Sequence, residues 1–394
     1  MDGGNRDVEV GKIPVMAFRP SHEAKLRELL HNICLHEIKL CSDAAKEFVK
    51  LLKGETGGDL LRLYFQSSPN FAELLEAWKL RHEKQGLSYI FSLIQTILSH
   101  PEGKDRSTDI GRAIDQFGRL LVEEKLDDIY KELNSKEGKQ QSAALSLLAS
   151  IVRRGPGMAS EIAKKFDFKG FAKLAEYNTQ GTEKVKKHST RKAFVGFAIS
   201  FLEVGKPGLL SSVLNKKEMY SKVLPGLGKD DDDTVASVLS TLKDKILVEE
   251  SLISPGLRSV LFGIVTLKHL ASISAREDAG IVNELAHDVL VKVCTDPSNG
   301  LMPDAKRKLR GNSDRLLMLM KGLRAAEIGY HRDLLLAIVR GRPSLASDFL
   351  DEFPYNVEDF SSPSWLVFFR VRKCIYLYFT ASTVQFLLFC HSSN

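Results

Sequence analysis

Apolar residues recur along most of the chain at the spacing of an amphipathic helix. In residues 141–153 they stand at positions i, i+3, i+4 and i+7: Ala144, Leu147, Leu148 and Ile151. Residues 234–246 repeat this pattern. Such spacing lays one apolar stripe along a helix, and that stripe must be buried against a neighbouring element.

The same periodicity predicts further helices, and strand signals are few before residue 365, because no Asn-Gly or Asp-Gly hairpin joins alternating runs. The expected helices span residues 22–40, 43–53, 70–83, 87–99, 108–133, 157–166, 189–204, 256–274, 278–294, 303–321 and 330–341. Asn70 with Glu73 resembles a capping box, and Ser254-Pro255 resembles a helix start. We expect loops at 178–190 and 226–233.

Many of these helices follow one another in pairs joined by short turns, such as Gly155-Pro156-Gly157. Serial helix pairs are typical of armadillo and HEAT arrays. The sequence therefore predicts an all-α fold, an irregular armadillo/HEAT-like α-solenoid of paired helices, with a pair of compact helical bundles as the alternative. We expect a disordered N-terminus at 1–20, a helical-repeat domain at 21–364 and an atypical hydrophobic tail at 365–394.

Composition narrows the class of protein without naming a function. Hydrophobic residues make up 43% of the 394 residues, and the charged residues leave a net charge of +6. These are values of a soluble protein with a mild preference for acidic partners. The five cysteines include no CxxC pair, and the N-terminus carries no apolar run, so we expect a reducing compartment, the cytosol or the nucleus.

Catalytic and cofactor motifs are absent from the sequence. The nearest approach to a phosphate loop, Gly226 to Lys229, runs into four aspartates that would repel phosphate. His31, Cys34, His36 and Cys41 have spacings that fit no zinc finger or ribbon, so we expect a helix with two small buried cysteines. We therefore expect no enzyme, no catalytic, cofactor-binding or metal-ligating residues, no cofactor and no small-molecule substrate.

Basic clusters are the remaining candidates for a site. The proposed RNA contacts are Lys184, Lys186, Lys187, Arg191 and Lys192, and a second group of Lys306, Arg307, Lys308 and Arg310. Such residues on a concave helical array could hold RNA backbone through phosphate contacts. The alternative is a solvated surface. For the aspartates at 230–233 we expect a solvated loop whose last carboxylates favour the positive N-terminus of a helix beginning at Thr234.

Several segments, in their order along the chain, resemble the N-terminal domain of the nucleolar pre-ribosomal-associated protein 1 family. They are Gln66–Pro69 with Trp78, Ala193–Leu202 (AFVGFAISFL), Thr234–Gly263 and Asp348–Trp365. The resemblance covers roughly residues 60–365. Members of this family are similar to large helical-repeat scaffolds and are several times longer than this chain, which therefore resembles an N-terminal part.

The resemblance implies a function but no catalytic residues. It implies a nucleolar scaffold in early assembly of the large (pre-60S) ribosomal subunit and in rRNA processing, with pre-ribosomal RNA and pre-60S assembly factors as partners. A protein–protein adaptor of the armadillo or HEAT type, without an RNA role, is the alternative. An RNA-modifying enzyme would need a cofactor loop or paired carboxylates, which the sequence lacks.

The tail at 365–394 differs in composition from the rest, because aromatic and β-branched residues crowd in and acidic residues vanish. A membrane anchor would need about 20 apolar residues. The uncharged run from Cys374 to Cys390 has seventeen and includes several polar residues: Thr380, Ser382, Thr383 and Gln385. We expect no membrane partner and favour a truncated or mis-spliced reading frame, or an alternative transcript end.

Overall fold

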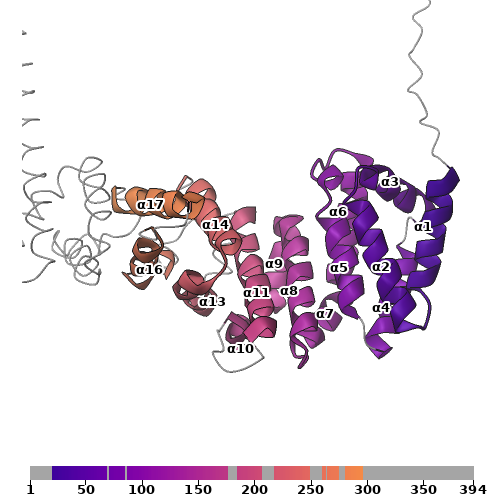
Figure 1. Cartoon of the computed structure of the whole chain (residues 1–394), viewed down its shortest axis with the longest axis horizontal. Coiled ribbons are helices and arrows are strands. Elements are labelled where there is room, and N and C mark those ends of the chain that lie inside the picture. The colour runs from indigo at the N-terminus through magenta and orange to yellow at the C-terminus, as the bar shows by residue number, and fades with distance from the viewer. Residues whose placement is uncertain are drawn as a thin grey trace, which may run out of the picture. The chain divides into compact units, whose positions relative to one another are not determined.

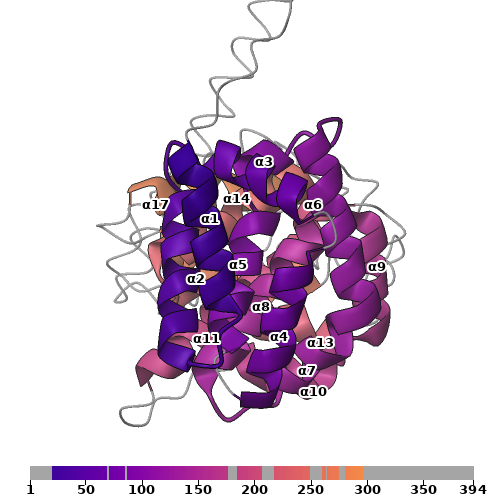
Figure 2. The same ribbon diagram turned by 90° about the vertical axis from the view of Figure 1, so that its right-hand side faces the viewer.

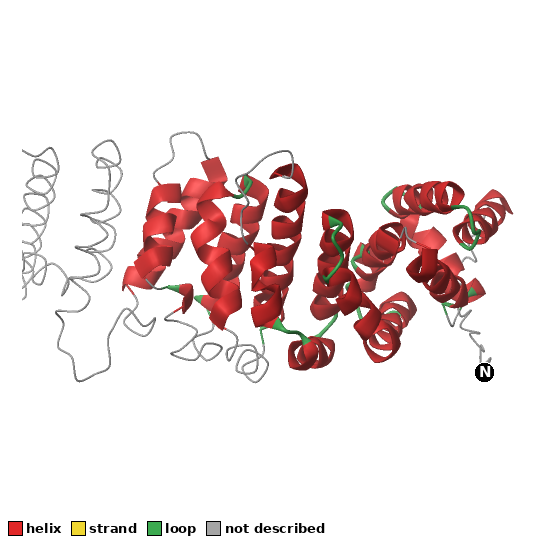
Figure 3. Cartoon of the chain, turned by 90° about the horizontal axis from the view of Figure 1, so that it is seen from below, coloured by secondary structure: helices red, strands yellow, loops and turns green. Residues whose placement is uncertain are grey.

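The computed structural model describes residues 20–68, 71–84, 87–175, 184–205, 217–248, 260–262, 264–274 and 280–295. Within these ranges every regular element is a helix and no strand occurs (Figure 3). The expectation of an all-α fold is thereby confirmed. The chain divides into two compact units, unit 1 at Met1–Phe117 and unit 2 at Gly118–Asn394.

Unit 1 is built around α5, the most apolar of its helices. Its elements are α1 (Pro20–Ile33), α2 (Ile38–Leu52), α3 (Gly57–Ser67), α4 (Ala72–Lys84), α5 (Leu87–Leu98), the 3₁₀ turn η1 (Pro101–Gly103) and α6 (Asp109–Leu120), which continues into unit 2. Eight residues of α5 are buried, on more than one face of the helix. A helix that is apolar around its circumference belongs in a core. It packs against α2 and α4 (Figure 2).

The predicted helix over 22–40 is wrong in one respect, because the chain turns after Ile33 and starts α2 at Ile38. The backbone N–H of Leu35 donates to the carbonyl of Asn32, three residues earlier, at 3.3 Å. A continuing α-helix would instead bond to the carbonyl four residues earlier. The guanidinium of the buried Arg81 donates to the carbonyl of Leu35. This partner lies 46 residues away, so local periodicity carried no sign of the break.

Helix α3 was not predicted, because its start at Gly57-Gly58 has the composition of a loop. A side chain at Gly57 would collide with the backbone of Leu52 at the end of α2. Glycine permits this close approach. The helix follows α2 at once and buries Leu60, Leu61 and Tyr64.

The capping box predicted for α4 rests on Asn70, which lies outside the described residues. In the described part of this helix start, the N–H of Leu75 donates to the carbonyl of Phe71 at 3.0 Å. Phe71 has a φ of 55°, which is unusual for a residue other than glycine. Its ring stacks on Phe117, with centroids 4.3 Å apart, and is 1% exposed. Burial of this ring offsets the backbone strain.

Unit 2 continues the chain in α-helices of 4 to 21 residues, joined in places by 3₁₀ and π turns. They are the π turn η2 (Leu121–Lys125), α7 (Leu126–Leu133), α8 (Gly138–Arg153), α9 (Pro156–Lys165), α10 (Phe168–Phe171), η3 (Ala172–Ala175), α11 (Lys184–Val204), α13 (Lys217–Val223), η4 (Leu224–Lys229), α14 (Asp232–Thr241), the π turn η5 (Leu242–Ile246), α16 (Ile264–Ser274) and α17 (Gly280–Thr295). The predicted helix over 108–133 is therefore α6, η2 and α7 in succession.

The core of unit 2 lies between α8 and α11, which run side by side (Figure 1). The apolar stripe predicted over 141–153 is buried in α8. Phe197 and Phe201 of α11 join Phe166 and Phe168 in a cluster whose neighbouring ring centroids are 4.7 to 6.3 Å apart. Aromatic pairs at such distances add to the burial energy of each ring.

Helices of unit 2 mostly contact their near neighbours in chain order. Helix α8 packs against α7, α9 and α11, and α11 packs against α14. Helix α14 packs against α17, which packs against α16. Neighbour-to-neighbour packing of this kind is consistent with an irregular helical solenoid.

Some expectations fall elsewhere. The predicted loop over 178–190 is wrong for its second half, since α11 begins at Lys184. The helices expected at 303–321 and 330–341, the Ser254-Pro255 start and the tail at 365–394 lie outside the described residues. Among the helices that are described, none combines the length and the apolar character needed to cross a membrane.

The packing of α8 generates a stability prediction. Leu148 is 0% exposed, so Leu148→Ala should lower the free energy of unfolding by about 2–5 kcal/mol, because less apolar surface is buried and a cavity remains. Ile281 of α17, in the same unit, is 72% exposed, so Ile281→Ala should change it by less than about 1 kcal/mol. Urea denaturation followed by circular dichroism measures both. Equal losses in the two variants would contradict the described core.

Candidate nucleic-acid interface

The first predicted basic cluster lies in the N-terminal half of α11. Lys184 is the first residue of this helix, and the first turn contains no acidic residue. Unpaired backbone amides give a helix N-terminus a partial positive charge, so lysines placed there make the end of the helix more attractive to anions. The side chains of this cluster are described only for Arg191 and Lys192.

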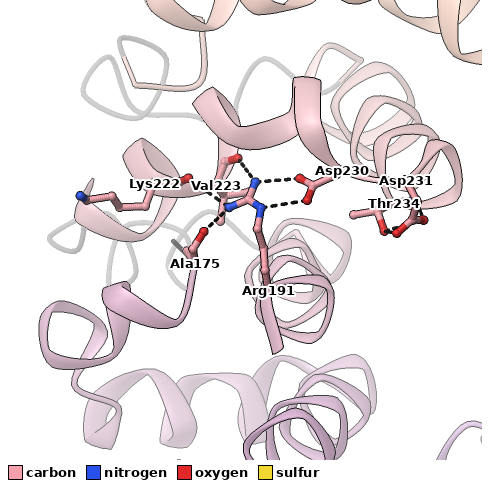
Figure 4. A network of polar contacts seen from close by, with 7 residues as sticks. All are labelled: Ala175, Arg191, Lys222, Val223, Asp230, Asp231 and Thr234. Carbon is pink, nitrogen blue, oxygen red and sulfur yellow. Dashed lines mark hydrogen bonds and ion pairs between the residues drawn. The ribbon is translucent and has the colours of Figure 1, made fainter. Parts of the chain in front are cut away.

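Arg191 is buried and serves the fold (Figure 4). Its Nε and Nη2 donate to the two carboxylate oxygens of Asp230 at 2.8 and 2.7 Å. The two side chains are only 1% and 4% exposed. This is the bidentate geometry for which the planar guanidinium is suited, in a setting that water does not reach.

The remaining donors of Arg191 bind backbone carbonyls on three sides (Figure 4). Nη2 donates to Val223 at 3.0 Å, and Nη1 donates to Lys222 at 3.4 Å and to Ala175. A side chain at Gly226 would collide with this guanidinium. The group therefore joins the end of η3, the end of α13 and the loop before α14 to α11, and glycine at 226 leaves room for it.

Burial shifts the pKa values of Arg191 and Asp230 in the directions that favour their neutral forms. It lowers the pKa of Arg191 to about 10. Together with the neighbouring Asp231 carboxylate, it raises the pKa of Asp230 to about 7. Each charge has left water and depends on the other for compensation. Arg191 is consequently not exposed to a phosphate, whereas its neighbour Lys192 is.

Lys192 reaches the second aspartate of the acidic run. Its Nζ lies 3.0 Å from Oδ1 of Asp231, with the two side chains 54% and 49% exposed. Asp231 also accepts from the backbone N–H of Thr234 at 3.1 Å and so caps α14. The loop predicted over 226–233 is wrong at both ends, because η4 extends to Lys229 and α14 begins at Asp232 instead of Thr234. The aspartates do stabilise the N-terminus of the helix, through the cap at Asp231, but the buried side chain of Asp230 was not predicted.

The other candidate residues fall in different places. The second basic group, Lys306, Arg307, Lys308 and Arg310, lies outside the described residues. The prediction of one helix with two buried cysteines is wrong for Cys34, which follows the end of α1 and is half-buried, whereas Cys41 of α2 is buried. The thiol of Cys34 donates its hydrogen to the carbonyl of Glu73 at 3.3 Å. Within the described ranges, no three His, Cys, Asp or Glu side chains are grouped to hold a metal ion.

Unit 1 contains a cavity of about 480 Å³ between the end of α2, one face of α5 and η1. None of the predicted site residues lines it. Its histidine, His100, uses both ring nitrogens, one with the carbonyl of Leu52 at 3.1 Å and one with the N–H of Glu102 at 3.3 Å. His100 therefore fastens the end of α2 to η1.

The buried pair generates a second prediction. Arg191→Met leaves Asp230 buried without its partner, so the free energy of unfolding should fall by about 3–5 kcal/mol. Lys192→Met removes an exposed pair one residue away and should cost less than about 1 kcal/mol. In the double variant Arg191→Met/Asp230→Asn, the loss should be smaller than the sum of the single losses. Urea denaturation of the original chain, the three single variants Arg191→Met, Asp230→Asn and Lys192→Met, and the double variant tests this, and additive losses would rule out the coupling.

Two nucleolar proteins have sequences similar to this chain. Nucleolar pre-ribosomal-associated protein 1 of Homo sapiens is 27% identical over 283 residues, which cover 66% of this chain and 12% of that protein. The Mus musculus protein of the same name is 25% identical over 256 residues, covering 59% of this chain and 11% of its own length. The chain therefore spans about an eighth or less of these relatives.

A family model confirms the relationship that the sequence segments suggested. The Npa1 model, described as ribosome 60S biogenesis N-terminal, matches residues 71–368. The match includes α4 to α17 and the whole Arg191 network, and it agrees closely with the resemblance seen over residues 60–365. Because it covers well over half of the sequence, the chain belongs to the Npa1 family of 60S ribosome biogenesis N-terminal domains.

Proposed function

We propose that this chain is a non-enzymatic scaffold that acts in the nucleolus of the nucleus, in early pre-60S assembly and in rRNA processing. The observation that carries this proposal is the family match over residues 71–368. The names of the human and mouse relatives, both nucleolar and pre-ribosomal, support the location and the process. The chain contributes an N-terminal helical part of that scaffold.

The proposed partners are pre-ribosomal RNA and pre-60S assembly factors. An array of helix pairs offers long surfaces on which such partners can be held. For RNA, the proposed contacts on α11 are Lys184, Lys186, Lys187 and Lys192, which together with the helix N-terminus favour phosphate. The second proposed group is Lys306, Arg307, Lys308 and Arg310. Arg191 is left out, because its guanidinium is enclosed by its own fold.

A protein–protein adaptor without an RNA role is the second candidate, and one observation favours it. The two basic residues of the α11 cluster whose side chains are described both pair with aspartates of the same chain, Arg191 with Asp230 and Lys192 with Asp231. A surface whose charges are already paired gains less from phosphate. Salt dependence separates the two functions, because counterion release makes RNA binding fall steeply with ionic strength.

The third prediction tests the RNA function. Replacing Lys184, Lys186, Lys187 and Lys192 together by Gln should weaken binding of a single-stranded RNA oligonucleotide. The plot of log affinity against log salt should flatten by about 0.7 for each phosphate that the variant no longer binds. Fluorescence anisotropy of a labelled oligonucleotide at several salt concentrations measures both quantities with the whole chain.

A matched control removes the same charge elsewhere in unit 2. Lys164, Lys165, Lys169 and Lys173 are exposed, and changing all four to Gln lowers the net charge equally. The control should keep nearly the original slope. If both quadruple variants flatten the slope alike, only net charge matters. If the intact chain does not bind the RNA at any of the salt concentrations, the adaptor function is favoured instead.

A further inference from the structure

Next to the buried pair, the surface of α11 carries Lys192, which already forms an ion pair with Asp231. Lys192 follows Arg191 in α11, and Asp231 follows Asp230 in the loop before α14. Consecutive residues of one segment thus pair with consecutive residues of the other. The inner pair is enclosed and bidentate, so it fixes the loop against the helix, and the outer pair is held beside it at 3.0 Å.

Asp231 is fixed by more than its lysine. Its Oδ1 accepts from the N–H of Thr234 at 3.1 Å and from the Thr234 hydroxyl at 3.0 Å, in addition to Lys192. Burial opposes its charge, but bonds from Lys192 and Thr234 keep the pKa of Asp231 below its ordinary value. The carboxylate is therefore charged at neutral pH and stays in place.

A phosphate that approaches Lys192 must compete with this carboxylate. The two side chains are about half exposed, so replacing Asp231 by a phosphate at Lys192 costs little folding free energy. The binding free energy gained is also small, since one anion replaces another. A ligand with a single phosphate makes no other contact that would add to it. A polyanion that contacts the other lysines of α11 at the same time brings a phosphate to Lys192 at high local concentration.

We infer that Asp231 is a specificity-determining residue of the proposed RNA-binding surface. It competes with phosphate for Lys192 within the chain. The N-terminal half of α11 therefore binds an RNA backbone, which carries many phosphates, in preference to a ligand with a single phosphate. The inference rests on the proposed RNA function and adds to it a role for an acidic residue, Asp231. Asp231 positions and masks a contact residue and itself touches no RNA.

Asp231→Asn tests the inference with little damage to the fold, because Asn caps a helix N-terminus as well as Asp does. Lys192 is then released, so affinity for a single-stranded RNA oligonucleotide should rise several-fold at low salt. The salt slope should stay nearly unchanged, because RNA that is held by the other lysines already brings a phosphate to Lys192 in the original chain. Adenosine monophosphate should also compete better for the variant than for the original chain.

The control is Asp233→Asn, which removes an exposed charge two residues away that has no bond to Lys192. It should raise affinity far less. In a Lys192→Gln background, Asp231→Asn should lose most of its effect. Asp231→Ser, a second neutral cap, should repeat the result and guards against a folding artefact.

The outcomes separate the inference from the function on which it rests. If the original chain binds RNA with a salt dependence but Asp231→Asn and Asp233→Asn behave alike, Asp231 is not a competitor and only the inference falls. Persistence of the Asp231→Asn effect without Lys192 also overturns it. If neither the original chain nor any variant binds RNA, the proposed RNA function falls, and the inference falls with it.

Discussion

The buried ion pair between Arg191 and Asp230 is the interaction on which the described part of unit 2 most depends. One guanidinium binds the carboxylate of Asp230 and three backbone carbonyls, one at the end of η3 and two at the end of α13. Removing two charges from water is costly unless nearly every donor is satisfied. The arrangement therefore tolerates little change, and it requires a glycine at 226 where a side chain would collide with the guanidinium.

The same pair determines the chemistry of the adjoining surface. By fixing the loop before α14 against α11, it places Asp231 next to Lys192 and sets the cap from which α14 begins. The basic cluster of the sequence therefore divides into three parts in the fold. Arg191 is buried, Lys192 is paired with Asp231, and the remaining lysines lie in the first turns of α11. The RNA contacts proposed for this face therefore exclude Arg191, whose charge is already used by the fold.

Local features of the sequence predicted much of the fold, and long-range contacts account for the errors. The period of apolar residues located α8, α9 and α17 to within a few residues, because it reflects burial along one helix. The break before α2 escaped prediction, since it depends on Arg81, and α3 escaped because Gly57 fits against α2. At the candidate site, Arg191 and Asp230 are 39 residues apart. The only local signal of their pairing was that each has a neighbour of like charge, Lys192 beside Arg191 and Asp231 beside Asp230.

Hydrogen exchange of Arg191→Lys tests most directly whether the buried pair organises this region. Lysine keeps the charge but cannot bind the carboxylate and three carbonyls with one planar fork. Amides of α13, η4 and the first turn of α14 should then exchange faster than in the original chain, while those of α8 keep their protection. Unchanged protection in α13, η4 and α14 would contradict the account, as would an equal loss in α5 of unit 1.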